Sequence, residues 1–553
     1  MAMRRRVAGV SALAILTGLA VSAPAQAADE FRTLARDGVT LQYHRVAKTT
    51  TPVKGTGATR SDFDGDGVDD IAATGDPGDF NLPHYPTGVV VVRYSSAPQV
   101  DYFAGVLPPD GGCSCFGMAV VAGDFNGDGY DDLAIGDMDE VDPGNKTRAG
   151  GVWVIPGSRT GLVVDSVQHF NQSSPGVPGA AETYDWFGSA LAAGDINGDG
   201  RDDLAIGAFR EAIGAVKDAG AVTILYGGVG GLTTVGAQQL HQDQAAVPGS
   251  AERGDHFGRT VAIGKVNNDR YADLVIGAPQ ENDGQSWDGT GMVTLMWGSA
   301  SGVKLSGATS VTGAAVYPKT GDANTVAWYL GETLAIGDVN GDGLGEVIAG
   351  APGAQTPAIN AGLIAVFTGR SGGLSRDAAK IISQRTAGVP GSPEQEDRFG
   401  GTLAVGDVTG DGRADVLVGA PGEAIGTKAG AGTVALLKGS ASGLTGTGAQ
   451  GFDQDHSVVP GGAERNDLFG SSVAILNLNG TGPLDAVVAS SGEEVAGDLA
   501  GYPSGTISRF HGSSAGLVAQ ANSWSGLSLR TDRLWPRRYG MRIAGPQSGG
   551  LLY

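Results

Sequence analysis

Residues 123–136 read GDFNGDGYDDLAIG, and residues 194–207 repeat almost the same sequence, GDINGDGRDDLAIG. Each copy places four side-chain oxygen donors within nine residues, at positions 1, 3, 5 and 9 of an acidic loop that begins at Asp124 or Asp195. A glycine follows position 5, where the chain can turn sharply because glycine accepts positive φ. The pattern predicts a loop for a hard cation such as Ca²⁺, which takes six to eight oxygen ligands.

The acidic loop recurs about every 70 residues, which indicates one repeat architecture rather than several unlike domains. Five of the seven units open with Phe-Gly, whereas the fifth unit opens with Leu330-Gly331 and the first has only Lys54-Gly55. Period-two alternation bounded by glycine and proline predicts four short strands per unit. The loops begin at Asp62, Asp124, Asp195, Lys265, Asp338, Asp407 and Asn477.

Seven units of four strands predict an all-β fold, a seven-bladed β-propeller built from repeats of about 70 residues. A linear solenoid is the alternative, and it is disfavoured because the ends do not resemble the polar caps of a solenoid. Residues 38–47 resemble a fourth strand with no unit before it, so we expect them to complete the last blade. Tyr539-Gly540, one repeat length after Phe469, resembles a further Phe-Gly opening and predicts a competing closure strand.

The first 27 residues predict a signal peptide. Three arginines precede an apolar run from Val7 to Val21, and Ala25-Gln26-Ala27 forms a cleavage site. A membrane anchor is the alternative, but a run of about 15 residues is shorter than the roughly 18 that a span needs. We therefore expect a secreted protein with no membrane span, divided into a signal peptide at 1–27, a propeller at 28–520 and a C-terminal closure strand or tail at 521–553.

The charge balance limits the partners. The chain has 59 acidic and 37 basic residues, a formal net charge of −22, and removal of the signal peptide makes it three units more negative. Such a chain is repelled by nucleic acid and by anionic lipid surfaces, and it attracts cations. We expect a monomer that binds no nucleic acid.

The residue at position 12 distinguishes these loops from the calcium loops of helix-loop-helix proteins. An EF-hand closes on a carboxylate there, whereas the five complete loops have apolar strand residues, so each loop connects two strands. Lys265 replaces the first acid of the fourth loop, where its ammonium could stand in the place of the ion, and Asp485 is the only charge in the seventh. A single loop of this kind could be a solvated acidic turn, but five in register favour calcium.

We therefore predict about five calcium ions per chain. The predicted ligands are Asp62, Asp64, Asp66 and Asp70; Asp124, Asn126, Asp128 and Asp132; Asp195, Asn197, Asp199 and Asp203; Asp338, Asn340, Asp342 and Glu346; and Asp407, Thr409, Asp411 and Asp415.

The order of Phe-Gly, acidic loop and Gly-Ala-Pro, as in Phe399-Gly400 and Gly419-Ala420-Pro421, resembles the FG-GAP repeat. This repeat builds the N-terminal propellers of integrin alpha subunits and occurs in many secreted bacterial integrin-like proteins. The resemblance covers essentially the whole chain after the signal peptide, and it implies calcium in the loops between the first two strands of the blades. This sequence has no counterpart of the inserted adhesion domain or the leg domains, so we do not extend the resemblance to integrin signalling.

The resemblance implies an extracellular binding or adhesion module for a protein or glycan ligand. Ligands would meet the face opposite the calcium loops, built from loops such as 277–291, with Trp186, Trp287 and Trp328 as candidate anchors. Buried blade packing is the alternative for each tryptophan. A secreted hydrolase with the propeller as scaffold is the alternative function, because FG-GAP propellers also occur in phospholipase-like and glycan-active proteins. Two convergent acids or a Ser/His pair in the central channel would favour it.

A second acidic pattern follows four Val-Pro-Gly segments. Its members could be acid–base pairs: Glu182/Asp185, Glu252/Asp255, Glu394/Asp397 and Glu464/Asp467. An enzyme usually needs one asymmetric site, so four equivalent copies favour turns whose acids accept backbone N–H groups. The histidines are scattered, and we name no catalytic residue. Cys113 and Cys115, in an exported chain, predict a local disulfide.

Overall fold

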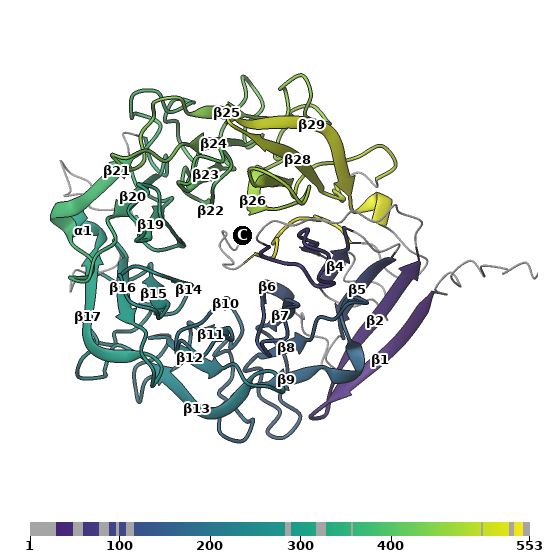
Figure 1. Cartoon of the computed structure of the whole chain (residues 1–553), viewed down its shortest axis with the longest axis vertical. Helices are drawn as coiled ribbons and strands as arrows, with labels where there is room; N and C mark the ends of the chain where they lie inside the picture. Colours follow the sequence, from purple (N-terminus) through teal and green to yellow (C-terminus); the bar gives the residue numbers. More distant parts are fainter. Residues whose placement is uncertain are drawn as a thin grey trace, which may run out of the picture.

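The computed structural model describes residues 29–47, 59–76, 88–95, 99–106, 115–282, 289–316, 328–355, 358–498, 501–529 and 536–545. Within these ranges the chain forms seven antiparallel sheets around a central axis (Figure 1). The predicted all-β fold and seven-bladed propeller are confirmed. The solenoid alternative is wrong, because the last blade packs against the first. The predicted signal peptide lies outside the described residues.

Blades 2 to 7 each contain four strands that follow one another from the axis outward. Blades 2 to 4 consist of β6 (Phe116–Gly123), β7 (Asp132–Asp137), β8 (Gly151–Ile155) and β9 (Gln168–Phe170); β10 (Ala190–Gly194), β11 (Asp203–Ala208), β12 (Ala221–Tyr226) and β13 (Thr233–Leu240); and β14 (Thr260–Gly264), β15 (Asp273–Ala278), β16 (Met292–Trp297) and β17 (Lys304–Thr312).

Blades 5 to 7 repeat the arrangement with β18 (Thr333–Gly337), β19 (Glu346–Ala351), β20 (Leu363–Phe367) and β21 (Ala379–Ile382); β22 (Thr402–Gly406), β23 (Asp415–Ala420), β24 (Thr433–Leu437) and β25 (Gln450–Phe452); and β26 (Phe469–Leu476), β27 (Asp485–Ser490), β28 (Thr506–Ser513) and β29 (Gly516–Ser525). The described helices are single turns in the connections: α1 (Gly313–Val316), η1 (Val164–Ser166), η2 (Arg376–Ala378) and η3 (Leu527–Leu529).

Blade 1 differs from the others. Its sheet has the order β1-β2-β5-β4-β3, with β1 (Glu30–Arg36), β2 (Val39–Ala47), β3 (Ile71–Gly75), β4 (Val89–Arg93) and β5 (Gln99–Gly105). The strand expected to complete the last blade, β2, instead pairs with β5, so that expectation is wrong. The seventh unit already has its own fourth strand, β29, whereas the outer edge of β5 can accept another strand.

The C-terminal segment 536–545 lies along the inner edge of blade 1 (Figure 1). The N–H of Gly540 donates to the carbonyl of Thr74 at 2.8 Å, the N–H of Thr74 donates to the carbonyl of Arg542 at 2.9 Å, and the N–H of Ala544 donates to the carbonyl of Ala72 at 2.8 Å. This segment therefore takes the place that a Phe-Gly strand has in the other blades, and the first and last described segments of the chain lie in one blade.

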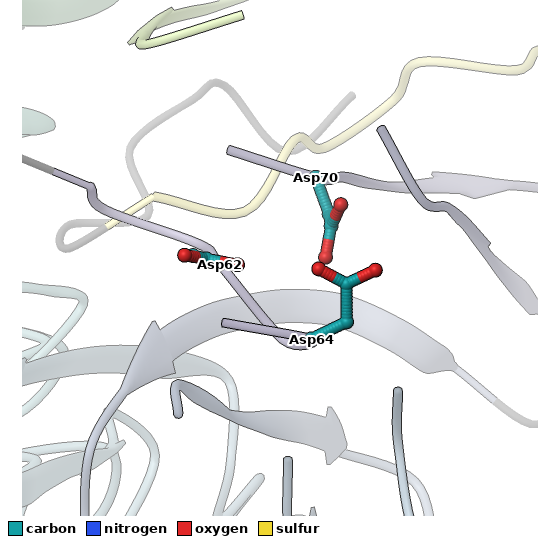
Figure 2. Close-up of side chains that lie close together, drawn as sticks. All are labelled: Asp62, Asp64 and Asp70. Atoms are coloured by element: carbon teal, nitrogen blue, oxygen red, sulfur yellow. The ribbon is translucent and has the colours of Figure 1, made fainter. Parts of the chain in front are cut away.

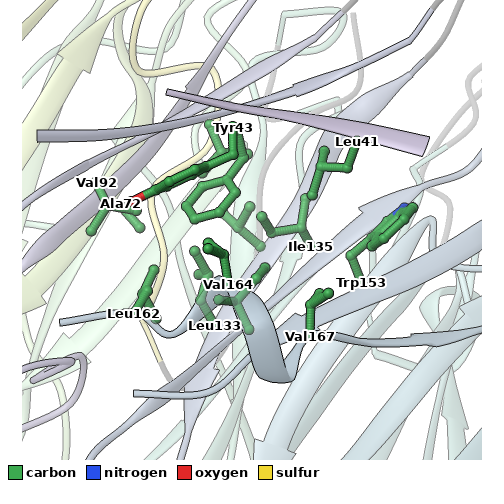
Figure 3. Close-up of a cluster of buried hydrophobic side chains, with 14 of the residues drawn as sticks. Leu41, Tyr43, Ala72, Val92, Leu133, Ile135, Trp153, Leu162, Val164 and Val167 are labelled. Atoms are coloured by element: carbon green, nitrogen blue, oxygen red, sulfur yellow. The ribbon is translucent and has the colours of Figure 1, made fainter. Parts of the chain in front are cut away.

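The core of the described chain consists of seven apolar clusters, each between two neighbouring blades. Figure 3 shows the cluster between blades 1 and 2, where Leu41 and Tyr43 of β2 pack with Leu133 and Trp153. The second strand of each of blades 2 to 7 is buried along its whole length, because blades cover both of its faces. Packing thus fixes the start of each second strand, where position 9 of the acidic loop lies.

Candidate metal sites

The first aspartate of each complete loop accepts three backbone hydrogen bonds. In the second loop, Asp124 Oδ1 accepts from the N–H groups of Gly127 at 2.7 Å and Asp128 at 3.1 Å, and Oδ2 accepts from Gly129 at 2.9 Å. The same bonds form around the other four first aspartates. These three hydrogen bonds to the position-1 aspartate therefore hold the shape of the turn without a metal ion.

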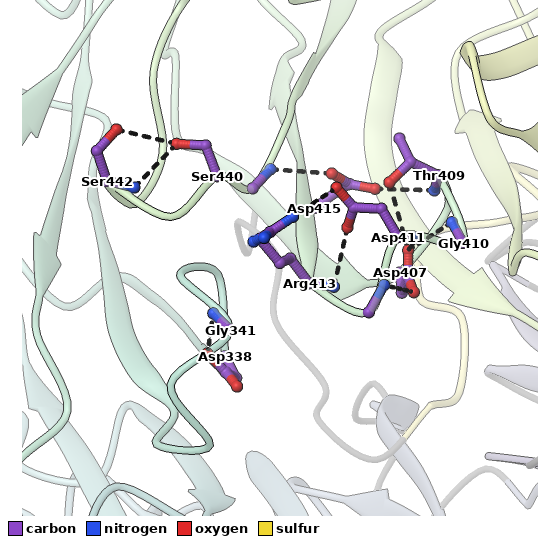
Figure 4. Close-up of polar contacts among 12 residues, drawn as sticks. Asp338, Gly341, Asp407, Thr409, Gly410, Asp411, Arg413, Asp415, Ser440 and Ser442 are labelled. Atoms are coloured by element: carbon purple, nitrogen blue, oxygen red, sulfur yellow. Dashed lines mark hydrogen bonds and ion pairs between the residues drawn. The ribbon is translucent and has the colours of Figure 1, made fainter.

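Positions 3 and 5 also face the loop backbone. Asn126 Oδ1 accepts from the N–H of Asp128 at 2.8 Å, and Asp128 Oδ1 accepts from the N–H of Tyr130 at 3.0 Å. Figure 4 shows the sixth loop, where Asp411 makes the corresponding bond with Arg413. Sixteen of the twenty predicted ligands lie in the loops directly before β3, β7, β11, β19 and β23, and the other four are the first residues of the last four of these strands: Asp132, Asp203, Glu346 and Asp415.

The acid at position 9 is buried and joins two strands. Asp132 Oδ2 accepts from the N–H of Phe125 at 3.1 Å, and Oδ1 accepts from the N–H of Gly157 beyond the third strand at 2.9 Å. Burial, with repulsion from Asp124 and Asp128, raises the pKa of Asp132 from 3.8 to about 8. Asp273 makes equivalent bonds in the fourth blade, whose loop lacks the first acid. Position 9 therefore has a structural role apart from any ion.

Three carboxylates converge in the first loop (Figure 2). Asp62, Asp64 and Asp70 each offer an oxygen, and these oxygens lie within 4.8 Å of one another in a buried setting. Burial and the neighbouring carboxylates raise the pKa of Asp70 well above its ordinary value. Three hard oxygen donors at this separation fit a calcium ion, which would also offset the repulsion among them.

Two loops contain a counter-charge that the sequence analysis missed. The Arg413 guanidinium lies 3.0 Å from the Asp411 carboxylate (Figure 4), and Arg201 lies 3.5 Å from Asp199. Both arginines stand at position 7, two residues after the aspartate that they contact. These partly exposed pairs place a guanidinium beside a predicted calcium ligand in the third and sixth loops.

The fourth loop corrects one expectation. The Lys265 side chain is exposed, and its ammonium makes no ion pair with Asp269 or Asp273 among the residues that the structure describes. The lysine therefore does not occupy the place of an ion. What the loop lacks is the acceptor at position 1, because a lysine cannot accept the three N–H groups that an aspartate binds.

The seventh loop has a cationic partner. Asp485 Oδ2 lies 3.4 Å from the Arg509 guanidinium, and its Oδ1 lies 3.0 Å from His511 Nδ1. The side-chain amide of Asn479 donates to the same Oδ1 at 3.0 Å. Asp485 is therefore satisfied without a metal.

The loops also join the blades to one another. The N–H at position 8 of each loop donates to the carbonyl at position 1 of the preceding loop, in all seven blades, at 2.7–3.0 Å. The bond from Asp69 to Asn477 closes this ring between blades 1 and 7. Where position 8 is an aspartate, its carboxylate accepts the position-1 N–H in return, as Asp131 does from Asp62 at 2.8 Å. The Asp-Asp doublets in three loops were the signal for this contact.

The acids of the Val-Pro-Gly segments lie at the other ends of the strands. Each aspartate accepts the backbone N–H of the glutamate three residues before it, which agrees with the turn interpretation. A further glutamate, which the sequence pattern did not indicate, joins each pair from the next blade: Glu211, Glu281, Glu423 or Glu493. Burial and repulsion from Glu211 raise the pKa of Asp185 to about 8, and burial and repulsion from Glu281 raise that of Asp255 to about 7.

The candidate anchors differ in exposure. Trp328 is buried in the core between blades 4 and 5, so its ring is no exposed anchor. Trp186 is half-buried, with the Arg210 guanidinium 4.6 Å from its ring centroid and Phe209 at 5.1 Å. Trp287, and Cys113 of the predicted disulfide, lie outside the described residues.

A cavity of about 260 Å³ lies among the innermost strands of blades 4 to 7. Apolar side chains of β14, β18, β22 and β26 line it together with Arg60 and Gly545, and Arg60 donates to the carbonyl of Val405 at 2.6 Å. Among the described residues, its lining contains neither an acid nor a serine or histidine. The signal that would favour a hydrolase is therefore missing from this lining.

Comparisons with known proteins agree with this geometry. The FG-GAP repeat family matches residues 116–155, 187–225, 257–296, 330–367 and 399–437, which are blades 2 to 6. Integrin alpha-8 of Gallus gallus is 29% identical over 248 residues, 44% of this chain and 21% of that protein. Integrin alpha-5 of Xenopus laevis is 34% identical over 170 residues, 30% of this chain and 15% of that protein.

A second kind of relative also matches. Phosphatidylinositol-glycan-specific phospholipase D of Bos taurus is 31% identical over 163 residues, 30% of this chain and 18% of that protein. The chain thus spans about a fifth or less of the length of these relatives. A solved structure, Bacillus licheniformis rhamnogalacturonan lyase PL11, aligns over 83% of this chain and 87% of its own with a TM-score of 0.30 and 10% identity.

The chain is an FG-GAP repeat protein with integrin alpha homologues, and its repeats build a seven-bladed propeller. No helix among the described residues is long and apolar enough to cross a membrane.

Proposed function

We propose that this chain is a secreted, calcium-binding propeller that acts as a monomeric extracellular binding or adhesion module for a protein or glycan ligand. The convergence of Asp62, Asp64 and Asp70 within 4.8 Å carries the calcium part of the proposal. The four other complete loops have the same backbone bonds around their first aspartate, so we assign one ion to each of the five, with the twenty predicted side chains as ligands.

The calcium loops and the proposed ligand face lie at opposite ends of the strands. Strands alternate in direction within a blade, so the connections between the first and second strands lie at one end. The connections between the second and third strands, and between blades, lie at the other end. Ions at one end would therefore stabilise the blades without contacting a ligand at the other.

The first test is metal content and thermal stability. Dialysed chain should retain about five calcium ions, and chelation should lower the melting temperature, because an ion that binds only the folded loop adds about 2.7 kcal/mol at a hundredfold excess over its dissociation constant. Two or fewer ions per chain would mean that the loops are acidic turns only, and an unchanged melting curve would contradict the stabilising role of the ions.

The ligand part needs a separate test. Glycan arrays and extracellular-protein binding screens with the calcium-loaded chain should identify a ligand, and Asp128→Ala, in the second loop, should lower the melting temperature while binding at the opposite face stays within about twofold. Loss of binding without a change in stability would place the calcium in the recognition site and contradict the assignment of faces.

A further inference from the structure

A second set of acidic side chains occupies four junctions between blades, at the ends of the strands opposite the acidic loops. Each set contains a glutamine, a glutamate, an aspartate and a glutamate from the next blade. In every set the glutamine side-chain N–H donates to that last glutamate. The sets are Gln172, Glu182, Asp185 and Glu211; Gln242, Glu252, Asp255 and Glu281; Gln384, Glu394, Asp397 and Glu423; and Gln454, Glu464, Asp467 and Glu493.

The set between blades 3 and 4 has the geometry of a cation site. Glu252, Asp255 and Glu281 each offer a carboxylate oxygen, and the three oxygens lie within 4.8 Å of one another. Asp255 is 0% exposed and Glu281 is 7% exposed, whereas Glu252 is exposed at the rim. Neither Glu252 nor Asp255 forms an ion pair with a lysine or arginine in the described part of the chain. Their negative charge has no basic partner there.

Two buried oxygens of this set have no hydrogen-bond partner among the described residues. Asp255 Oδ2 accepts the N–H of Glu252 at 2.6 Å, but Asp255 Oδ1 has no partner. Gln242 Nε2 donates to Glu281 at 2.7 Å, but Gln242 Oε1 has no partner either, and this side chain is 2% exposed. Buried polar oxygens are rarely left unsatisfied, because each one has lost its hydrogen bonds to water without gaining another. A cation bound among the three carboxylates would satisfy Asp255 Oδ1.

The junction between blades 4 and 5 gives an internal comparison. At this junction Trp328 occupies the position that corresponds to the aspartate. Ala354 occupies the position of the second glutamate, and Gly313 occupies the position of the glutamine. Trp328 and Ala354 pack in the same apolar cluster. All three polar residues are thus replaced together, and the blades still join. Since apolar packing suffices at this junction, the carboxylates elsewhere point to a bound ligand rather than to a requirement of the fold.

We propose that Glu252, Asp255 and Glu281 bind a divalent cation at a site distinct from the acidic loops, next to the Gln242 side chain that donates to Glu281. Calcium suits an all-oxygen set of irregular geometry. The ion would link the segment before β14, which contains Glu252 and Asp255, to the β15–β16 connection, which contains Glu281. It would therefore stabilise the proposed ligand face between blades 3 and 4.

The test compares ion counts between variants of the full chain. In equilibrium dialysis with ⁴⁵Ca²⁺ at pH 7.5, Glu281→Gln and Asp255→Asn should each bind one ion fewer than the wild type. Glu332→Gln is the matched control, because Glu332 is also a buried acid but pairs with Arg259 at 3.3 Å instead of joining the cluster. Equal counts in all four proteins would overturn the proposal and indicate that Asp255 and Glu281 share a proton.

The comparison does not depend on how many loops are filled, because it measures a difference of one ion. If a variant does not fold, crystals of the wild-type chain grown with Mn²⁺ provide the second measurement. An anomalous difference peak among the three carboxylates supports the site. Peaks at the acidic loops alone contradict it while leaving the loop proposal intact.

Discussion

Position 1 of the acidic loop decides whether the turn can form its full set of hydrogen bonds. Each aspartate there accepts three backbone N–H groups, whereas Lys265 can accept none and points into solvent. The oxygens of positions 3, 5 and 9 remain in the fourth loop as Asn267, Asp269 and Asp273. One residue therefore separates the loops that have the full set of hydrogen bonds to position 1 from the fourth loop, which lacks them.

Lys265→Asp should add one calcium ion per chain, because the new carboxylate supplies both the missing acceptor and a ligand. Equilibrium dialysis checks the count. Lys265→Ala removes the ammonium without adding an acceptor, so its count should equal that of the wild type. A gain in the alanine variant would mean that the lysine charge alone blocks the site, and no gain in the aspartate variant would contradict the role of position 1.

At the scale of the element, the second strand of each of blades 2 to 7 begins with a buried acid. Asp132 and its equivalents link the loop to the end of the third strand by backbone hydrogen bonds. Burial raises the pKa of Asp203 to about 7 and that of Glu346 to about 6. The stability at the start of each of these strands therefore depends on the state of its acid. The acid can be protonated, ionised beside a metal ion, or ionised with no metal nearby.

This dependence predicts the effect of pH on the chelated chain. An acid whose pKa is higher in the folded chain binds its proton more tightly there, so the free energy of unfolding falls as pH rises from about 4 to about 8. In chelator, the melting temperature should therefore decrease between pH 5 and pH 8. Excess calcium should remove most of that decrease, because the ion stabilises the ionised form.

Asp132→Asn provides the control, because asparagine does not titrate. Its melting temperature in chelator should depend less steeply on pH than that of the wild type. A wild-type melting temperature that rises with pH in chelator would show that other groups dominate.

At the scale of the whole molecule, the first and last described segments of the chain both lie in blade 1. The N-terminal hairpin β1–β2 covers its outer edge, and the C-terminal segment forms its inner edge. Tyr539 is fully buried in the core between blades 7 and 1, at the position where five of the repeats have a phenylalanine and one has Leu330. Seven inter-blade hydrogen bonds complete the ring at the loop end. Loss of the closing contact would expose the apolar faces of two blades.

Tyr539→Ala should lower the free energy of unfolding by about 3–5 kcal/mol, the usual cost of removing a buried aromatic side chain. Tyr539→Phe should cost nothing or stabilise the fold, because the buried hydroxyl has no hydrogen-bond partner among the described residues. Denaturant unfolding of the two variants measures the difference. Equal stability of the alanine variant and the wild type would mean that the C-terminal segment does not close the ring.

The sequence by itself determined the number of repeats, the strand pattern of each unit and the loops that carry the acids, because these are periodic and local. It also marked Tyr539-Gly540 as a Phe-Gly opening. Only the tertiary structure decided which strand joins which sheet, since any exposed strand edge offers the same backbone groups and β2 could pair with more than one. It alone revealed the position-8 contacts and the third carboxylate at each junction, because those residues belong to different blades and meet only when the ring closes.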